Sequence, residues 1–274
     1  MLARGVPGPA IESPRTLTTN LSKTQIDRLG DRLKRGSLVE SDLRSLDDYR
    51  RTFGEAYETV VQSIREQLHL EPTGRPAKST GSLIEKLHRE SIRLTQVQDI
   101  AGCRVIVADV AEQERVVASL CTVFPTASVV DRRAIPSHGY RAVHVVAQVS
   151  GTLVEIQVRS SLQHLWGELS EKLSDVVDPS IKYGGGPAIV RALLSKTSDG
   201  IARFEETESQ IAVLETDIIG LAQRKLPEED EKRLRVIEQQ VAEKKEKHAK
   251  SKEQLRDALN EGIAQIAKLK KQGL

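Results

Sequence analysis

The sequence is poor in aromatic residues and in cysteine, and its charges nearly cancel. Three Phe, four Tyr and one Trp among 274 residues are too few for a surface that binds single strands by stacking successive bases. The 41 Lys and Arg against 39 Asp and Glu leave a net charge of +2, which excludes a chain-wide basic surface but not a local basic patch. Cys103 and Cys121 lie in apolar runs, so we expect small core residues and neither a disulfide framework nor a zinc site.

Long apolar runs and the glycine loops of common nucleotide-binding folds are also missing. No segment approaches the ~18 uninterrupted apolar residues of a membrane-spanning helix, and the N-terminal residues contain no apolar stretch like that of a signal peptide. Neither the P-loop nor the Rossmann glycine motif occurs. We therefore expect a soluble, cytoplasmic protein that has no membrane segment.

Changes in composition and periodicity divide the chain into four segments. Residues 1–20 show no apolar periodicity and are expected to form a flexible tail. Residues 21–72 are expected to form helices. Ser22 and Gln25 make a capping box at the start of the first, and apolar residues spaced by three or four from Leu43 to Leu68 predict a second, single helix that ends near His69. Residues 73–187 alternate between strand and helix patterns, and residues 188–274 are helical throughout.

The 73–187 segment predicts an α+β domain. A helix pattern with Leu83, Leu87 and Leu94 inward is followed by the buried strand CRVIVADV and then by another helix pattern. Residues 143–159 read as two strands joined at Ser150-Gly151, which suits a two-residue hairpin turn. Mixed strands and helices in one compact stretch are typical of α+β or α/β architecture.

The register of this hairpin places four polar side chains on one face of the sheet. If Val149 pairs with Thr152, one face carries only apolar residues. The other face carries His144, Glu155, Gln157 and Arg159. Four polar groups within reach of one another suit the floor of a pocket, although a solvent-exposed sheet face has the same pattern.

Asp99 and a group of cations add to this candidate site. Asp99 directly precedes the buried strand, so it can join Glu155 as a pair of carboxylates that holds Mg²⁺ against phosphates; a helix-end Asp is the structural alternative. Lys78, Ser82 and Lys86 are spaced by four on one helix face, which suits a polyphosphate or an ordinary exposed basic face. Tyr140 follows Gly139, where its ring can stack on a base or pack in the core.

The C-terminal segment predicts a long helical hairpin. Phe204, Ile211 and Ile218 repeat every seven residues, as do Leu214 and Leu221, which indicates a coiled-coil seam. Leu226-Pro227, followed by an acidic turn, begins a second helix. The very polar stretch 242–253 is read as a solvated helix face rather than a nucleic-acid arm. We expect the hairpin to pack on the α+β domain or on another subunit, and we expect a homo-oligomer formed through these C-terminal helices.

Ordered sequence blocks between residues 75 and 170 resemble the synthetase domain of the RelA/SpoT alarmone family. The blocks are K78-STGS-LIEKL, DIAGCRVIV (99–107), GYRAVH (139–144), EIQVRS (155–160) and QHLWGEL (163–169). The resemblance implies a nucleotidyltransferase-like mixed β-sheet flanked by helices. It also implies Mg²⁺-dependent transfer of pyrophosphate from ATP to the ribose 3′-hydroxyl of GDP or GTP, with AMP as the second product.

The resemblance assigns roles to individual residues. Asp99 would bind Mg²⁺, and Glu155 would assist the metal or act as base toward the attacking hydroxyl. The residues that would hold ATP are Arg75, Lys78, Ser82, Lys86 and Arg104. Tyr140 would stack on the acceptor base. The residues that would line the acceptor side with it are His144, Gln157 and Arg159.

Other features of the sequence leave the acceptor open. No hydrolase or ribosome-sensing region is recognisable, so the chain resembles the small single-function synthetases. The family's usual Asp-Tyr-Ile and Pro-Lys before the Gly-Tyr pair are replaced by Asp131-Arg132-Arg133 and Pro136-Ser137. The sequences of the GYRAVH and QHLWGEL blocks also resemble those of toxic family members, which pyrophosphorylate the 3′-terminal adenosine of tRNA and are neutralised by an antitoxin. For such an acceptor Arg132, Arg133 and Arg141 are the candidate contacts, and a catalytically silent assembly protein is the alternative of another class.

Overall fold

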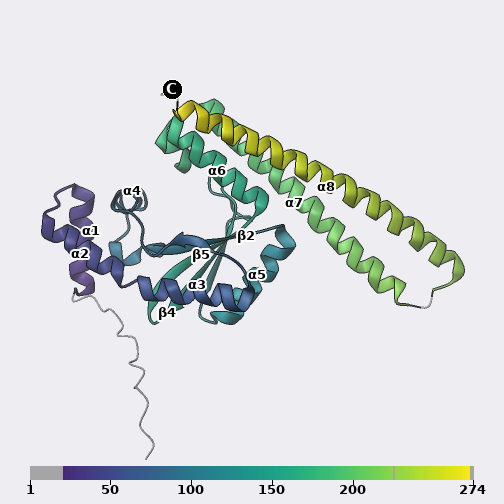
Figure 1. Cartoon of the computed structure of the whole chain (residues 1–274), viewed down its shortest axis with the longest axis horizontal. Coiled ribbons are helices and arrows are strands. Elements are labelled where there is room, and N and C mark those ends of the chain that lie inside the picture. The colour runs from purple at the N-terminus through teal and green to yellow at the C-terminus, as the bar shows by residue number, and fades with distance from the viewer. Residues whose placement is uncertain (1–20, 225, 272–274) are drawn as a thin grey trace, which may run out of the picture.

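A mixed five-stranded sheet forms the centre of the molecule (Figure 1). The computed structural model describes residues 21–224 and 226–271, so the expected tail 1–20 lies outside the described residues. The strands are β1 (Thr73–Arg75), β2 (Ala101–Val107), β3 (Ser128–Asp131), β4 (Val143–Val149) and β5 (Thr152–Ser160), in the order β1-β2-β5-β4-β3. β5 pairs in parallel with β2 and antiparallel with β4. The expected α+β fold, a mixed sheet flanked by helices, is confirmed.

The N-terminal segment forms three helices, α1 (Lys23–Arg35), α2 (Glu40–Arg51) and α3 (Gly54–Leu68). α1 begins at the predicted capping box, in which Ser22 and Gln25 bond each other's backbone N–H. The single helix expected from Leu43 to His69 is wrong, because the chain breaks at Thr52-Phe53 between α2 and α3. Leu43 consequently faces solvent, with 43% of its surface exposed.

One face of the sheet carries the main hydrophobic core. Alternate residues of β2 and β5 point into it, and Cys103, Val105, Ile156 and Val158 are almost fully buried. α3 and α5 (Val110–Val123) pack against this face. Because side chains alternate along a strand, Gly102, Arg104, Glu155 and Gln157 lie on the opposite face, which is left available for a site.

α4 (Thr80–Glu90) is held against the N-terminal helices at the edge of that opposite face. Leu83 and Leu87 are fully buried as expected, whereas Leu94 is buried from a separate short 3₁₀ helix, η1 (Leu94–Gln96). The Arg50 guanidinium on α2 donates to Thr80 Oγ1 at 2.9 Å, in the first turn of α4. The N-terminal helices therefore fix the start of the helix that carries Ser82 and Lys86.

Two strands and one cysteine differ from expectation. β1 and β3 were not anticipated: β1 has three residues, and all four residues of β3 are exposed, so neither shows an apolar alternation. Gly74 is needed in β1, because a Cβ there would lie 2.4 Å from the Gly102 carbonyl oxygen. Cys103 is a buried free thiol, as expected, but Cys121 is only half-buried.

The C-terminal region forms a hairpin of two long helices that begins beside α6 and extends past the sheet (Figure 1). α6 (Ser161–Val176) and the 3₁₀ helix η2 (Pro179–Tyr183) lead into α7 (Ala188–Ala222) and α8 (Glu228–Lys271). A second core joins Leu162, Trp166 and Leu169 of α6 to Leu194 and Ile201 of α7 and to Leu259 of α8. None of the helices within residues 21–224 and 226–271 has the length and apolar character needed to span a membrane.

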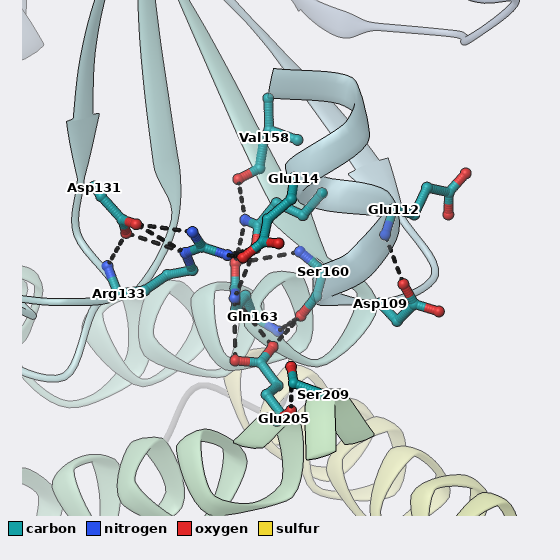
Figure 2. A network of polar contacts seen from close by, with 11 residues as sticks. Asp109, Glu112, Glu114, Asp131, Arg133, Val158, Ser160, Gln163, Glu205 and Ser209 are labelled. Carbon is teal, nitrogen blue, oxygen red and sulfur yellow. Dashed lines mark hydrogen bonds and ion pairs between the residues drawn. The ribbon is translucent and has the colours of Figure 1, made fainter. Parts of the chain in front are cut away.

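A buried polar network attaches α7 to the sheet domain (Figure 2). Glu205 of α7 is only 4% exposed. Its carboxylate accepts hydrogen bonds from Ser160 Oγ at 2.5 Å and from Gln163 Nε2 at 3.0 Å. Gln113 of α5 donates in turn to Gln163 Oε1 at 2.9 Å and accepts from Arg133. The end of β5, the start of α6 and the middle of α7 are thereby joined at one buried carboxylate.

Replacing Glu205 by Gln should stabilise the protein at neutral pH. Burial raises the pKa of Glu205, although hydrogen bonds from Ser160 and Gln163 and the charge of Arg141 oppose this and Glu208 adds to it. A carboxyl whose folded-state pKa is raised loses stability as pH rises from its ordinary value, 4.5, through the folded value. The Gln side chain keeps an acceptor oxygen without that charge. We expect Glu205→Gln to melt a few degrees above wild type at pH 7, with the gap closing toward pH 4.5; a gap of equal size at both pH values would contradict this.

Candidate active site

The predicted β4–β5 register is confirmed, and it brings the polar candidates together. Val149 pairs with Thr152 and His144 with Gln157. A closed ring of hydrogen bonds results. His144 Nδ1 lies 2.9 Å from Glu155 Oε1, and His144 Nε2 lies 2.9 Å from the Tyr140 hydroxyl. Arg159 completes the ring through Gln157.

The Arg159 guanidinium closes this ring from its buried position at the end of β5. It donates to the Tyr140 hydroxyl at 3.1 Å and to Gln157 Oε1 at 2.7 Å, while Gln157 Nε2 donates to Glu155 Oε2 at 2.8 Å. Since Arg159 has no acceptor atom, the Tyr140 hydroxyl accepts from it and can donate to His144. His144 Nδ1–H then donates to Glu155. Each of the four acceptor-side candidates is thus tied to Glu155.

Asp99 lies at the start of β2 between two ammonium groups. Its carboxylate pairs with Lys78, and Asp99 Oδ1 lies 2.9 Å from Lys86 Nζ. All three side chains are mostly buried, each with 15–17% of its surface exposed. Lys86 reaches Asp99 from α4, whereas Lys78 lies just before this helix, where its backbone N–H donates to the Ile100 carbonyl, so two cations from different segments meet at one carboxylate.

Both carboxylates are ionised at neutral pH. For Asp99, burial raises the pKa but the charges and hydrogen bonds of Lys78 and Lys86 outweigh it, so the pKa is lowered. For Glu155, burial likewise raises the pKa, and the hydrogen bonds from His144 and Gln157 bring it below its ordinary value despite repulsion from Asp99. A pair of buried negative charges at one site favours the binding of a cation.

A cleft of about 410 Å³ opens over these groups. Both carboxylates line it, as do Lys78, Gln157 and the two candidate ATP-binding arginines, Arg75 and Arg104. Ser82 is not part of its wall; its hydroxyl accepts from Ser79 Oγ in the first turn of α4. Lys86 reaches the site only through Asp99. A polar cleft of this volume is large enough for part of a nucleotide.

The structure adds residues of α6 that the sequence reasoning missed. His164, Glu168 and Glu171 follow one helix face at spacings of four and three, and each lies near Arg104: His164 Nδ1 at 3.5 Å, Glu168 at 3.6 Å and Glu171 at 3.8 Å. Gly167 is required on the same helix, because a Cβ there would lie 2.5 Å from Arg159 Nη1. The sequence signal for these three residues is their i, i+4, i+7 spacing directly after β5.

The three arginines considered for tRNA lie outside the cleft. Arg133 is 18% exposed, and its guanidinium binds Asp131 at 2.8 Å and Gln113 at 3.2 Å (Figure 2). Arg141 is half-buried and lines a small hollow with Glu205 and Glu206. Arg132 is exposed, and among the residues that the structure describes only its backbone N–H is engaged, with the Ala142 carbonyl. A nucleic-acid contact by these residues stays a prediction.

The carboxylates of Asp99 and Glu155 suit a hard divalent cation whose remaining ligands come from substrate phosphates and water. Across the described parts of the chain, no three His, Cys, Asp or Glu side chains are grouped so as to hold a metal ion. Mg²⁺, however, is commonly held by one or two carboxylates together with substrate phosphates and water. Asp99 and Glu155 are ionised, and Asp99 already holds two cationic groups at the cleft. These two carboxylates would therefore hold Mg²⁺ when ATP is present.

Comparisons with known proteins agree with the sequence blocks. Residues 74–174 match the family model described as "Region found in RelA / SpoT proteins", so the predicted resemblance to the RelA/SpoT family is confirmed over this segment. Uncharacterized proteins of Mycobacterium tuberculosis (strain ATCC 25618 / H37Rv) and Mycobacterium bovis (strain ATCC BAA-935 / AF2122/97) are 39% identical over 116 residues. The match covers 40% of this chain and 42% of those relatives, so less than half of their length is spanned.

Among solved structures the chain is similar to small alarmone synthetase 1 from Bacillus subtilis. The likeness covers 62% of this chain and 99% of that one, with 26% identity and a TM-score of 0.48. The same enzyme bound to its product pppGpp matches with 25% identity over 65% of this chain and all of that one, with a TM-score of 0.46.

Proposed function

We propose that this RelA/SpoT-family chain is an ATP-dependent pyrophosphokinase that transfers the β,γ-pyrophosphoryl group of ATP to the ribose 3′-hydroxyl of GDP or GTP. One observation carries the proposal. Asp99 and Lys78 line one cleft inside the matched region together with Glu155 and Gln157. Behind this lining, Lys86 pairs with Asp99, and the hydrogen bonds of the ring connect Tyr140, His144 and Arg159 to Glu155. Cations for a polyphosphate and an aromatic platform for an acceptor base are therefore adjacent.

The reaction breaks one bond and forms one bond at the β-phosphorus. The acceptor 3′-oxygen attacks this atom, the bond to the α,β-bridging oxygen breaks, and AMP leaves. Mg²⁺, when bound with ATP, would supply neutralisation of the phosphate charge. Lys78 and Arg104, which line the cleft, bind and orient the triphosphate, since their positive charges lie where negative charge accumulates, and Lys86 holds the Asp99 carboxylate beside them. Glu155, ionised and fixed by His144 and Gln157, accepts the proton of the 3′-hydroxyl.

The proposal is tested with ATP labelled in its β and γ phosphates, incubated with the full chain and Mg²⁺. One reaction contains GDP and GTP, and a second contains deacylated tRNA. We expect label in a guanosine tetra- or pentaphosphate, with AMP formed in equal amount. Label in neither acceptor would contradict the proposal and favour a catalytically silent assembly protein.

A tRNA acceptor is the second candidate, and the exposure of Arg132 favours it. This side chain is exposed, and its backbone N–H donates to the carbonyl of Ala142, two residues after Tyr140, at the base of the loop that carries Tyr140. A cation there can bind a phosphate without reading sequence. Label on the 3′-terminal nucleotide of tRNA would establish this reaction, and a neutralising antitoxin would then be the partner to seek.

We further propose that the distal half of the α7–α8 hairpin pairs with a second copy of the chain. The predicted seam residues Leu214 and Leu221 are 41% and 40% exposed, and Val213, Ile219 and Val236 are more than half exposed. A second hairpin would cover them as a four-helix bundle, in which each helix buries its apolar face.

Charging this surface should separate the copies. In light scattering, wild type should exceed the 30.3 kDa of one chain, and the double variant Val213→Glu, Ile219→Glu should fall to it. Ser251→Glu, at an exposed position on α8, is the matched control and should keep the wild-type mass. A wild-type mass of one chain would overturn this proposal.

A further inference from the structure

The loop between β3 and β4 carries Tyr140, and Gly139 is the point at which this loop contacts α7. Residues 134–138 of this loop are exposed, and a cleft of about 610 Å³ remains between Pro136, His138 and the first turns of α7. The Tyr140 ring is therefore positioned by its own hydrogen bonds to His144 and Arg159 and by the contacts of its neighbour, Gly139.

Gly139 is held from behind by α7. Ser198 Oγ donates to the Gly139 carbonyl at 2.7 Å, and Trp166 Nε1 donates to the Leu194 carbonyl at 2.9 Å. A Cβ on Gly139 would lie 2.8 Å from Trp166 Cζ2 and 3.3 Å from Ser198 Cβ, and its φ of +89° favours glycine. The loop thus sits directly against Ser198 and the Trp166 indole.

Glu205 lies two turns further along the same face of α7 and supports the Arg159 end of the hydrogen-bonded ring. Leu194, Ser198, Ile201 and Glu205 are spaced by four, three and four, and none is more than 4% exposed. Glu205 binds Ser160, the residue directly after Arg159 (Figure 2). Tyr140 and Arg159 are themselves joined at 3.1 Å. One rigid helix face therefore contacts the neighbour of each of these two residues.

No comparable contact links α7 to the ATP side within the described residues. Lys78, Lys86 and Asp99 are positioned by α4 and by the start of β2, and α4 is braced by the N-terminal helices through Arg50. The two halves of the cleft thus have separate supports, α2 and α4 for ATP and α7 for the acceptor.

We propose that α7, through Ser198 and Glu205, is the positioning element for the acceptor half of the active site and sets acceptor affinity independently of ATP. The inference rests on the proposed function for the identity of the two substrates. Neither residue touches substrate: Ser198 acts through Gly139 and Tyr140, and Glu205 acts through Ser160 and Arg159. The C-terminal hairpin is then part of the catalytic apparatus and not only an assembly surface.

The test compares the KM for the acceptor with the KM for ATP in variants of Ser198 and Glu205. Ser198→Ala and Glu205→Ala should each raise KM for the acceptor about three- to tenfold, the range that one net hydrogen bond supports, with KM for ATP unchanged. Glu205→Gln keeps an acceptor oxygen for Ser160 and should recover most of the affinity. Thr216→Ala, at an exposed hydroxyl that bonds only the Ala212 carbonyl, should match wild type. An equal rise in KM for ATP, or unchanged constants, would overturn the proposal.

A binding measurement separates this proposal from the proposed reaction. Trp166 is the single tryptophan of the chain, and its ring lies 6.4 Å from the Tyr140 ring, so we expect its emission to change when an acceptor binds at Tyr140. GDP, or deacylated tRNA if that acceptor takes the label, is titrated without ATP. If wild type binds the acceptor but transfers no label, the proposed function fails. Weaker binding by Ser198→Ala would still support the role of α7 as the positioning element for the acceptor. Equal binding by both proteins, or no binding by wild type, would overturn it.

Discussion

Glu155→Gln should lower the rate of pyrophosphoryl transfer by about a thousandfold, the middle of the range for removal of a general base. Glu155 is the one carboxylate in the hydrogen-bonded ring, and His144 and Gln157 both donate to it. An amide of the same size cannot accept a proton from the 3′-hydroxyl, and it contributes no charge toward Mg²⁺. Its NH₂ group also faces a donor, which reorients the ring.

The thermal midpoint separates chemistry from folding in this variant. Glu155 lies on the polar face of β5, so its replacement leaves the apolar face of Val154, Ile156 and Val158 intact. We expect a shift within a few degrees, and initial-rate assays of label transfer measure the loss. Glu66→Gln, an exposed pair partner of Gln62 on α3, is the control and should be fully active. A Glu155→Gln rate within tenfold of wild type would remove Glu155 from the mechanism.

Asp99→Asn should reduce transfer by at least about a hundredfold and weaken ATP binding as well. A bound cation contributes several kcal/mol to the transition state, and each 1.36 kcal/mol is a factor of ten in rate. In the folded protein Asp99 is the shared counter-ion of Lys78 and Lys86. An amide leaves the two ammonium groups facing each other without that charge, so their positions beside the triphosphate are lost together.

The measurement is a pair of titrations, ATP and Mg²⁺, followed by transfer rate. Asp99→Asn should need more Mg²⁺ for half-maximal rate than wild type, whereas Asp48→Asn should not, because Asp48 is exposed and pairs only with Arg51 on α2. An unchanged Mg²⁺ requirement together with a normal rate would show that Asp99 serves only to pair the lysines.

Much of the site follows from local rules. The Ser150-Gly151 turn fixes the hairpin register, and the period of two then puts His144, Glu155 and Gln157 on one face. Asp99 was located by its place before an apolar strand. These inferences succeed because turn chemistry and strand alternation act over a few residues, within reach of a single sequence.

The parts that were missed depend on distant segments. The sequence does not show the break at Thr52-Phe53, because the apolar spacing continues across it. In the structure Phe53 still has near-helical backbone angles. β1 is a strand only because β2 offers an edge, and Arg133 is engaged because Gln113 of α5 lies beside it. Glu205 sits among polar residues of a long helix, and nothing near it in sequence indicates that Ser160 and Gln163 will enclose its carboxylate.

The position of β5 has a consequence for the timing of activity during translation. β5 is the last strand to be synthesised, yet it lies at the centre of the sheet between β2 and β4. A nascent chain that ends before residue 152 has two separate strand pairs, carries Asp99 and the lysines, and lacks Glu155 and Arg159 altogether. Helix α7, which seats the Tyr140 loop, emerges later still. The complete cleft can therefore form only after β5 has been made, and the Tyr140 loop can be seated only after α7 has followed it.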